Sequence, residues 1–483
     1  MDRVMAESGQ RDLAKETLLY ALAMVVSGLV QFAFLPFMSS FLTPEQAGEL
    51  GVVRIISEII AGIVVLGLPA SIIRAWHQTD AHRAVLVRSI VLPLAPLLVA
   101  SVLVLTLGGK VSALLFITNS SLLLHALALG GSVALLQVAL SMPRAKGMAG
   151  TYFIIQFIRG MLSLGLLFFL LRSLDAKGAM EAFLEARWIP TALAVLFSFF
   201  FIWKVTGSSS SIRSPKQLTG SMLAFSLPLV PASLALLVLS SADMFMLRTI
   251  STDLAQSGWY EWAGRAVLIL TPLTLGFSMA WHRYIFRKKK EGGRMDELGR
   301  SALLFMVTVN WAAMVLALLS NEIVSVFGGG EWLPAAKVLP WIAGSAAMYA
   351  LFTISQTAPL LTGQTKYIGW MTAFGAVVNI GFNLRLIPIA GAAGAAFATL
   401  ATNMFMALSL FWLGRKVFPV SFFAVVVMVI IPVFSGPLSG MNPGHRVIAI
   451  LVGTAVTVMI IQVLRSLGTG NALKFSSGDS NES

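Results

Sequence analysis

The chain has 483 residues, of which 57% are hydrophobic and only 11% are charged, and its mean hydropathy is +0.85. An average soluble protein carries about 25% charged residues, so this chain could not cover a water-soluble surface of its size. Its net charge is +13 and it contains no cysteine. These figures exclude soluble enzymes, nucleic-acid-binding proteins, disulfides and cysteine metal sites.

Apolar segments long enough to cross a bilayer follow one another along almost the whole chain. A transmembrane helix needs about 20 largely apolar residues, and backbone groups in lipid must bond within their own helix. We therefore predict an all-α polytopic membrane protein with about 14 transmembrane helices. The predicted spans cover residues 17–41, 48–73, 84–108, 119–142, 149–171, 180–203, 219–247, 257–282, 299–320, 334–357, 367–388, 391–414, 418–438 and 446–466.

Basic residues in the gaps between these spans indicate the orientation. They gather in alternate gaps, for example at Arg74, Arg144 and Lys146, and most densely over residues 283–300. The positive-inside rule makes these gaps cytoplasmic, and with them both termini. The first apolar run is too long for the core of a signal peptide, so it is predicted to be a retained helix.

Two parts of the chain resemble each other. In each, a short polar outer loop ends in a glycine, Gly48 or Gly258, and a second glycine and an arginine follow the next helix. The repeat predicts two parallel bundles that rock around a site between them. The predicted parts are an N-terminal bundle, a C-terminal bundle, two extra spans and a disordered cytoplasmic tail, at residues 1–205, 206–416, 417–467 and 468–483.

Charged residues inside predicted spans are the strongest functional signal, because a charge at the bilayer centre costs at least about 2.5–3.5 kcal/mol. Arg54, Arg159 and Arg265 lie within spans. A guanidinium group can bind two phosphate oxygens at once, so these arginines are predicted to line a cationic cavity that binds substrate. Arg54 and Arg265 occupy similar places in the two halves and are predicted to face each other. The alternative for Arg54 is an ion pair with Glu58, four residues further along the same helical face.

Further polar residues in the spans are weaker candidates. Asp243 and Glu58 are candidates for ion coupling, although Asp243 could instead pair with Arg248 or Arg265. Gln31, Asn379 and Asn383 are candidates for a polar cavity, or for hydrogen bonds between helices. Glu49 and Glu261 are predicted to lie near the outer ends of their spans, close enough to reach water.

Several kinds of site are missing from the sequence. It contains no Gly-x-x-x-x-Gly-Lys-Ser/Thr run, no cluster with metal-ligand spacing and no specific Ser/His/Asp arrangement. We predict no catalytic residues, no metal and no cofactor. The energy for transport is expected to come from an ion gradient, the membrane potential or the substrate gradient.

Three segments resemble the bacterial polysaccharide-biosynthesis flippases of the O-antigen type. The first is 41–51, followed by Leu66-Gly67-Leu68 and Arg74. The second is 225–231, followed by Ser241-Ala242-Asp243. The third is 361–366, followed by Asn379, Asn383 and the run 387–396. This family often has Asp-Arg where the chain has Asp243-Met244.

The resemblance implies membership of the multidrug/oligosaccharidyl-lipid/polysaccharide exporter superfamily and a location in the cytoplasmic (inner) membrane. It implies alternating access and a substrate consisting of an oligosaccharide linked to undecaprenyl pyrophosphate. The implied partners are this lipid-linked substrate, membrane lipids and a downstream polysaccharide polymerase, with no nucleic acid. Intramembrane arginines would suit the pyrophosphate.

Three alternatives stay open at this point. A lipid II flippase would need the same pyrophosphate chemistry. A drug/cation antiporter would need an acidic cavity, whereas the predicted cavity is basic. A membrane-embedded polysaccharide polymerase would need a long outer loop for its catalytic residues, and no outer gap is longer than roughly 15 residues.

Overall fold

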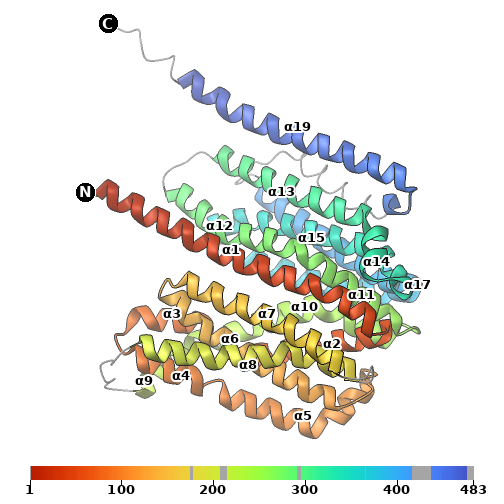
Figure 1. Ribbon diagram of the computed structural model, residues 1–483. Coiled ribbons are helices and arrows are strands. Elements are labelled where there is room, and N and C mark those ends of the chain that lie inside the picture. The colour runs from red at the N-terminus through yellow and green to blue at the C-terminus, as the bar shows by residue number, and fades with distance from the viewer. Residues whose placement is uncertain are drawn as a thin grey trace. The chain divides into compact units, whose positions relative to one another are not determined.

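The structure is a computed structural model that describes residues 2–173, 178–206, 215–290, 295–364, 366–415 and 437–475 (Figure 1). Every regular element within these ranges is a helix, as the sequence predicts. The chain divides into two compact units. The first contains residues 1–272 and 387–392, and the second contains residues 273–386 and 393–483.

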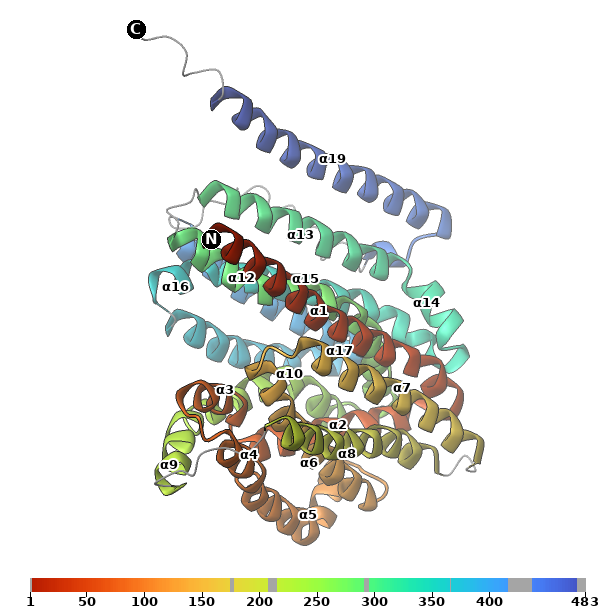
Figure 2. The same ribbon diagram turned by 60° about the vertical axis from the view of Figure 1, so that its left-hand side comes forward.

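The first unit is a bundle of long helices connected by short loops. α1 packs against α7, and α6 packs against both α2 and α8. α3, α4 and α9 lie together at one end of the bundle (Figures 1 and 2). The helices are α1 (Asp2–Phe41), α2 (Pro44–Val65), α3 (Leu68–Gln78), α4 (His82–Val91), α5 (Leu94–Leu114), α6 (Ser121–Ala145), α7 (Ala149–Ser173), α8 (Ala179–Val205), α9 (Pro215–Ser226), α10 (Leu229–Ile250), α11 (Ala255–Val267) and the 3-10 turn η2 (Leu268–Leu270).

Local sequence signals determine where α2 begins and bends. Thr43 caps the helix, and Gln46 completes a reciprocal capping box with it. Pro44 occupies the first turn, where its missing N–H is not needed. At the other end, Leu66 and Gly67 adopt left-handed backbone angles, with φ of 48° and 65°, and α3 continues the span. The motif that opens the first predicted repeat therefore forms a helix start.

The two repeat glycines permit a close approach between α2 and α11. A Cβ atom on Gly48 would overlap the side chain of Ser257, and one on Gly258 would overlap the carbonyl group of Pro44. These are the corresponding helices of the two predicted halves, and their first turns lie backbone to backbone. The contact places α10 and α11, assigned by the repeat to the second half, in the first compact unit.

The second unit is also helical throughout its described residues. α13 packs against α15 and α19, and the indole N–H of Trp311 donates to Thr454 at 2.9 Å. Residues 468–475, predicted to belong to a disordered tail, continue α19 because no proline interrupts the helix. The elements are α12 (Thr271–Lys290), α13 (Met295–Leu318), α14 (Ser320–Phe327), η3 (Gly330–Lys337), α15 (Leu339–Ser355), α16 (Thr357–Thr362), α17 (Lys366–Gly414) and α19 (Pro443–Phe475).

Within the described residues, nine helices are long and apolar enough to cross a membrane, or ten if the bent pair η3–α15 counts as one. α17 covers the two predicted spans 367–388 and 391–414, which Gly391 separates with non-helical angles (φ 55°, ψ −131°). The predicted span 219–247 is broken into α9 and α10, and 257–282 into α11, η2 and α12. The span 418–438 lies almost wholly outside the described residues. The total of about 14 spans stays a prediction.

Candidate functional site

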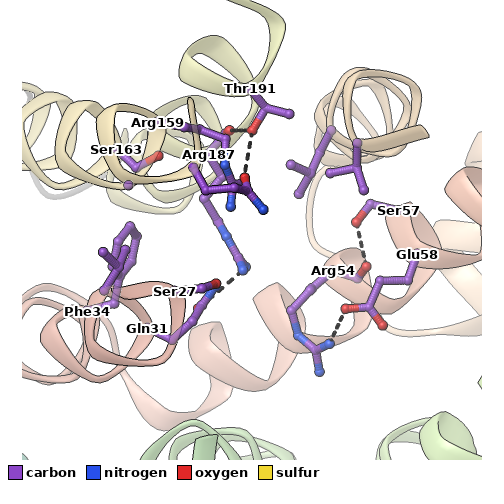
Figure 3. Close-up of a pocket in the computed structure, with 15 residues that line it drawn as sticks. Ser27, Gln31, Phe34, Arg54, Ser57, Glu58, Arg159, Ser163, Arg187 and Thr191 are labelled. Atoms are coloured by element: carbon purple, nitrogen blue, oxygen red, sulfur yellow. Dashed lines mark hydrogen bonds and ion pairs between the residues drawn. The ribbon is translucent and has the colours of Figure 1, made fainter. Parts of the chain in front are cut away.

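A polar cavity of about 140 Å³ lies inside the first unit, between α1, α2, α6, α7 and α8 (Figure 3). Charged and amide side chains from four of these helices point into it. Apolar residues such as Val30, Phe34 and Leu129 complete the wall. We call it the arginine pocket, after the three arginines that line it, which are Arg54, Arg159 and Arg187.

Arg54 is held by two carboxylates. Its Nη1 atom donates to Glu58 at 2.6 Å, and its Nε and Nη2 atoms each lie 3.1 Å from an oxygen of Glu261. The bond to Glu58 is the ion pair predicted as the alternative reading of Arg54. The bidentate bond to Glu261 joins α2 to α11, the same helices that approach through Gly48 and Gly258.

Arg265 shares the carboxylate of Glu261. Its Nε atom donates to Oε1 at 2.9 Å, and its Nη1 atom reaches the amide oxygen of Gln31 at 3.5 Å. Glu261 is only 4% exposed. The prediction that Glu261 reaches water near an outer membrane end is therefore wrong, because the guanidinium groups of Arg54 and Arg265 take the place of water around it.

Arg187 and Arg159 approach the pocket from α8 and α7. Arg187 donates from Nη2 to the amide oxygen of Gln31 at 3.3 Å, and Arg159 lies 3.5 Å from the hydroxyl of Thr191 (Figure 3). Among the residues whose side chains the structure describes, no carboxylate lies within 4.0 Å of either guanidinium group. The positive charges of these two arginines therefore lack a directly paired negative charge.

The charges around the pocket do not balance. Among the described residues, Arg54, Arg159, Arg187 and Arg265 have two carboxylates within ion-pair distance, those of Glu58 and Glu261. Arg265 is buried and the other three arginines are partly buried, so water screens the surplus positive charge less than it would at an exposed surface. The cavity is suited to an anion, and a phosphate would match the planar donor fork of arginine.

The structure brings together most, but not all, of the predicted site residues. Arg54, Arg159, Glu58 and Gln31 line the pocket, and Arg265 lies directly behind Glu261.

The other predicted residues lie elsewhere. Asp243 is buried and accepts a 2.6 Å hydrogen bond from the hydroxyl of Tyr260. Asn379 and Asn383 belong to the second unit, where the amide of Asn383 donates to Asn379 at 3.0 Å. Both residues belong to α17, so this bond lies within one helix and is not the bond between helices that the sequence left open.

Sequence reasoning missed one pocket residue, Arg187. It lies eight residues inside α8, within the predicted span 180–203, so its position alone could have identified it as an intramembrane charge. The role of Gln31 as the amide between Arg187 and Arg265 had no signal in the sequence, because the three residues come from three separate helices.

A second buried charge lies at the predicted outer end of the same unit. Arg248, 2% exposed, donates to the carbonyl groups of Glu45, Leu115 and Phe116 and lies 3.8 Å from the carboxylate of Glu49. Glu49 in turn accepts from the backbone and hydroxyl groups of Thr118, both at 2.8 Å. Glu49 was predicted to reach water, but it is 2% exposed because this network encloses it.

No protein-family model matches the chain, and no curated protein matches it in sequence. Several solved structures are similar to the chain in fold. An inward closed conformation of the lipid II flippase MurJ has a TM-score of 0.68 and 12% identity, and the match covers 95% of this chain and 100% of that one. An inward-facing multidrug resistance MATE family transporter of the MOP superfamily has a TM-score of 0.57 and 16% identity, covering 83% and 94%.

A Vibrio cholerae MATE transporter, VcmN, is similar to the same extent, with a TM-score of 0.57 and 17% identity over 85% of this chain and 97% of that one. These similarities cover 83–95% of this chain and 94–100% of the other chains, at 12–17% identity. The chain therefore has the all-α, multi-pass membrane fold that is found in MurJ and in MATE transporters of the MOP superfamily.

Proposed function

We propose that this protein is a flippase that moves an oligosaccharide linked to undecaprenyl pyrophosphate across the cytoplasmic membrane by alternating access. The observation that carries the proposal is the arginine pocket inside a bundle of apolar helices. Three arginines and Glu58 line it, and Arg265 and Glu261 lie directly behind its wall. A diphosphate is the part of such a substrate that most needs a cationic site away from water.

The arginines divide into two kinds. Arg54 and Arg265 are both paired with Glu261. The Arg54 pair holds α2 against α11, and the Arg265 pair lies within α11. Within the part of the chain that the structure describes, Arg159 and Arg187 bond to neutral oxygens, which a phosphate can replace with a stronger charge-assisted bond. We therefore place the diphosphate against Arg159 and Arg187, with Arg54 completing the wall. Glu58 is the carboxylate most available for ion coupling, because its side chain is 41% exposed.

The two alternatives within the superfamily differ in how well they fit the pocket. A drug/cation antiporter is disfavoured, because a cation would meet an excess of positive charge. A lipid II flippase is favoured by one specific observation, the similarity to MurJ over the full length of that chain. Lipid II also carries a pyrophosphate, so the pocket chemistry serves both substrates. In either case the proposed partners are the lipid-linked sugar, membrane lipids and an enzyme that polymerises the flipped sugar.

A gene deletion tests the identity of the proposed substrate. The measurement identifies the lipid-linked sugar that accumulates on the cytoplasmic leaflet. Accumulation of a surface-polysaccharide precursor supports the main proposal, and accumulation of lipid II supports the alternative. Unchanged levels of both would end the proposal.

Replacing Arg159 and Arg187 with glutamine tests the site. We expect transport by the double variant to fall at least about 100-fold, because each lost charge-assisted bond costs about 1.5–3 kcal/mol. The amount of protein in the membrane should not change. Arg172→Gln is the matched control, because Arg172 is exposed and lies on Phe168 in the last turn of α7, away from the pocket. Equal transport by the double variant and the control would contradict the assignment.

A further inference from the structure

A second, larger cavity of about 370 Å³ adjoins the arginine pocket. Its walls come from α3, α6 and α7, and it shares Val133, Gln156 and Arg159 with the pocket. We call it the α6–α7 crevice. It exists because α7 packs mainly against α1 and α8 and touches α6 much less. The lining residues Gln137 and Arg144 are exposed, so the crevice can be reached from outside the bundle.

Polar side chains form a line along the crevice. Tyr152, Gln156 and Arg159 lie at positions i, i+4 and i+7 of α7, so they share one helical face. The line is about 10 Å long, at 1.5 Å per residue. At its outer limit Arg144, in the last turn of α6, lies 5.8 Å from the centre of the Tyr152 ring. The crevice therefore has an exposed guanidinium group at one end and the half-buried Arg159 at the other.

Two residues that line both the crevice and the pocket each carry a buried polar atom without a hydrogen-bond partner among the described residues. These atoms are Nε of Arg159, a donor, and Oε1 of Gln156, an acceptor. A buried polar atom left unpaired costs about 1–3 kcal/mol, so a ligand that pairs with both atoms would recover that cost. A phosphate oxygen would accept from Arg159, and a sugar hydroxyl would donate to Gln156. A glycosyl phosphate offers both groups side by side.

The sizes of the two cavities suit the two parts of such a ligand. Sites for drug-sized molecules have volumes of about 300–1,000 Å³. The volume of the crevice, about 370 Å³, falls within this range, and that of the arginine pocket, about 140 Å³, falls below it. The pocket has room for a small group such as a phosphate, and the crevice has room for a sugar ring. Arg159 lines both cavities, so it can hold the phosphate at the junction between them.

We propose that the α6–α7 crevice is the entry subsite for the glycosyl-pyrophosphate headgroup, which meets Arg144 first and Arg159 next before its phosphate enters the arginine pocket. This inference rests on the proposed function and deepens it by naming a route. The route starts at Arg144, in a gap that the charge pattern predicts to be cytoplasmic. On this route, Arg144 binds the substrate and also helps to set the orientation of the chain in the membrane.

A cysteine-protection experiment tests the route, and the absence of native cysteine makes every label specific. The full chain in nanodiscs carries Gln137→Cys, which is the crevice reporter, or Ser163→Cys, which is the pocket reporter. A charged thiol reagent labels each variant with undecaprenyl pyrophosphate, inorganic pyrophosphate or undecaprenol present. We expect undecaprenyl pyrophosphate to slow the labelling of both reporters severalfold, and undecaprenol to have no effect.

The decisive comparison is between two basic residues of the same turn. Arg144→Ala should raise the concentration for half-protection of the crevice reporter about tenfold, the equivalent of one charge-assisted bond. Lys146→Ala removes the same charge two residues away, where the side chain lies over Trp76 outside the crevice, and should leave that concentration unchanged. Protection by inorganic pyrophosphate as well would support a phosphate site that does not need the lipid chain.

The results separate this inference from the proposed function. If the pocket reporter is protected and the crevice reporter is not, the route is wrong while the pocket assignment stands. Equal shifts in Arg144→Ala and Lys146→Ala, or protection by undecaprenol, would also overturn the route. If neither reporter is protected by undecaprenyl pyrophosphate, the proposed function itself fails.

Discussion

Glu261 is the residue on which the arrangement of the pocket most depends. Its carboxylate is buried between Arg54 and Arg265 and bonds to both, so it keeps two guanidinium groups in fixed positions. A buried ion pair adds little net stability, but removing one partner leaves an uncompensated charge. The position of the arginines within predicted spans identified them as candidates for the site. The position of Glu261 in its helix did not identify its role, because it does not reveal which arginine from another helix will reach the carboxylate.

The first prediction concerns this carboxylate. Glu261→Gln should lower the free energy of unfolding by about 3–5 kcal/mol, because the buried guanidinium group of Arg265 would lose its paired negative charge, while Arg54 would keep Glu58. Glu58→Gln is the control, since the Glu58 side chain is 41% exposed and water can replace it. Its effect should stay below about 1 kcal/mol. Thermal unfolding of both variants in detergent, followed by tryptophan fluorescence, measures the difference, and equal losses would contradict this account of Glu261.

The same contacts change how the arginine variants should be read. If the arginines of the pocket bind substrate, Arg54→Ala and Arg265→Ala should abolish transport while the protein stays in the membrane. Both residues bond to Glu261, so their loss also leaves a buried carboxylate with fewer partners. Arg159 and Arg187 are better tests of binding, because their removal leaves no carboxylate unpaired.

At the scale of elements, the contact between α2 and α11 positions the site. Gly48 and Gly258 remove the side chains that would hold the two helices apart, and this close approach lets Arg54 of α2 reach Glu261 of α11. The sequence predicted these glycines as marks of a repeat. That they face one another could not be read from spacing, because spacing along the chain says nothing about which helices become neighbours.

The second prediction tests this approach. Gly258→Ala places a methyl group onto the carbonyl of Pro44 and should destabilise the protein by roughly 1–3 kcal/mol, as overpacking of a tight contact does. Gly264→Ala lies in the same helix with open space around its Cβ position. It should be neutral, or stabilising by about 0.5–1 kcal/mol, because alanine favours the helix. Melting temperatures of the two variants provide the measurement, and a similar loss in both would contradict the proposed close contact.

At the scale of the whole molecule, Arg248 ties together four segments at the predicted outer end of the first unit. It bonds to the carbonyl groups of Glu45, Leu115 and Phe116 and to the hydroxyl of Ser257. The alternating access that we propose requires an outer contact that closes while the substrate enters from inside and opens afterwards. The Arg248 contact is suited to that role, because it uses many bonds to neutral acceptors that water can replace one by one.

The third prediction follows from that role. Arg248→Ala should shift the population toward a form open on the outside, and so raise the rate at which an impermeant thiol reagent, added outside, labels Ser57→Cys in the arginine pocket. We expect an increase of about tenfold, which corresponds to a shift of about 1.4 kcal/mol. Arg172→Ala is the control, an exposed arginine that makes no such contact. An unchanged rate in Arg248→Ala would show that this contact is not the outer closure.

The sequence by itself determined the class of the protein. Its excess of apolar residues and scarcity of charge leave only a bundle of membrane helices, because lipid offers the backbone no other partners. It also identified Arg54, Arg159 and Arg265, since a charge within a span is costly wherever the helix lies. The tertiary structure decided which of these charges are neutralised. Arg54 and Arg265 converge on Glu261. Arg159 and Arg187 line the cavity, and no carboxylate of the described residues lies within 4.0 Å of either guanidinium group. Which charges are neutralised depends on which helices are neighbours. Side-chain packing in three dimensions determines those neighbours, and position along the chain does not.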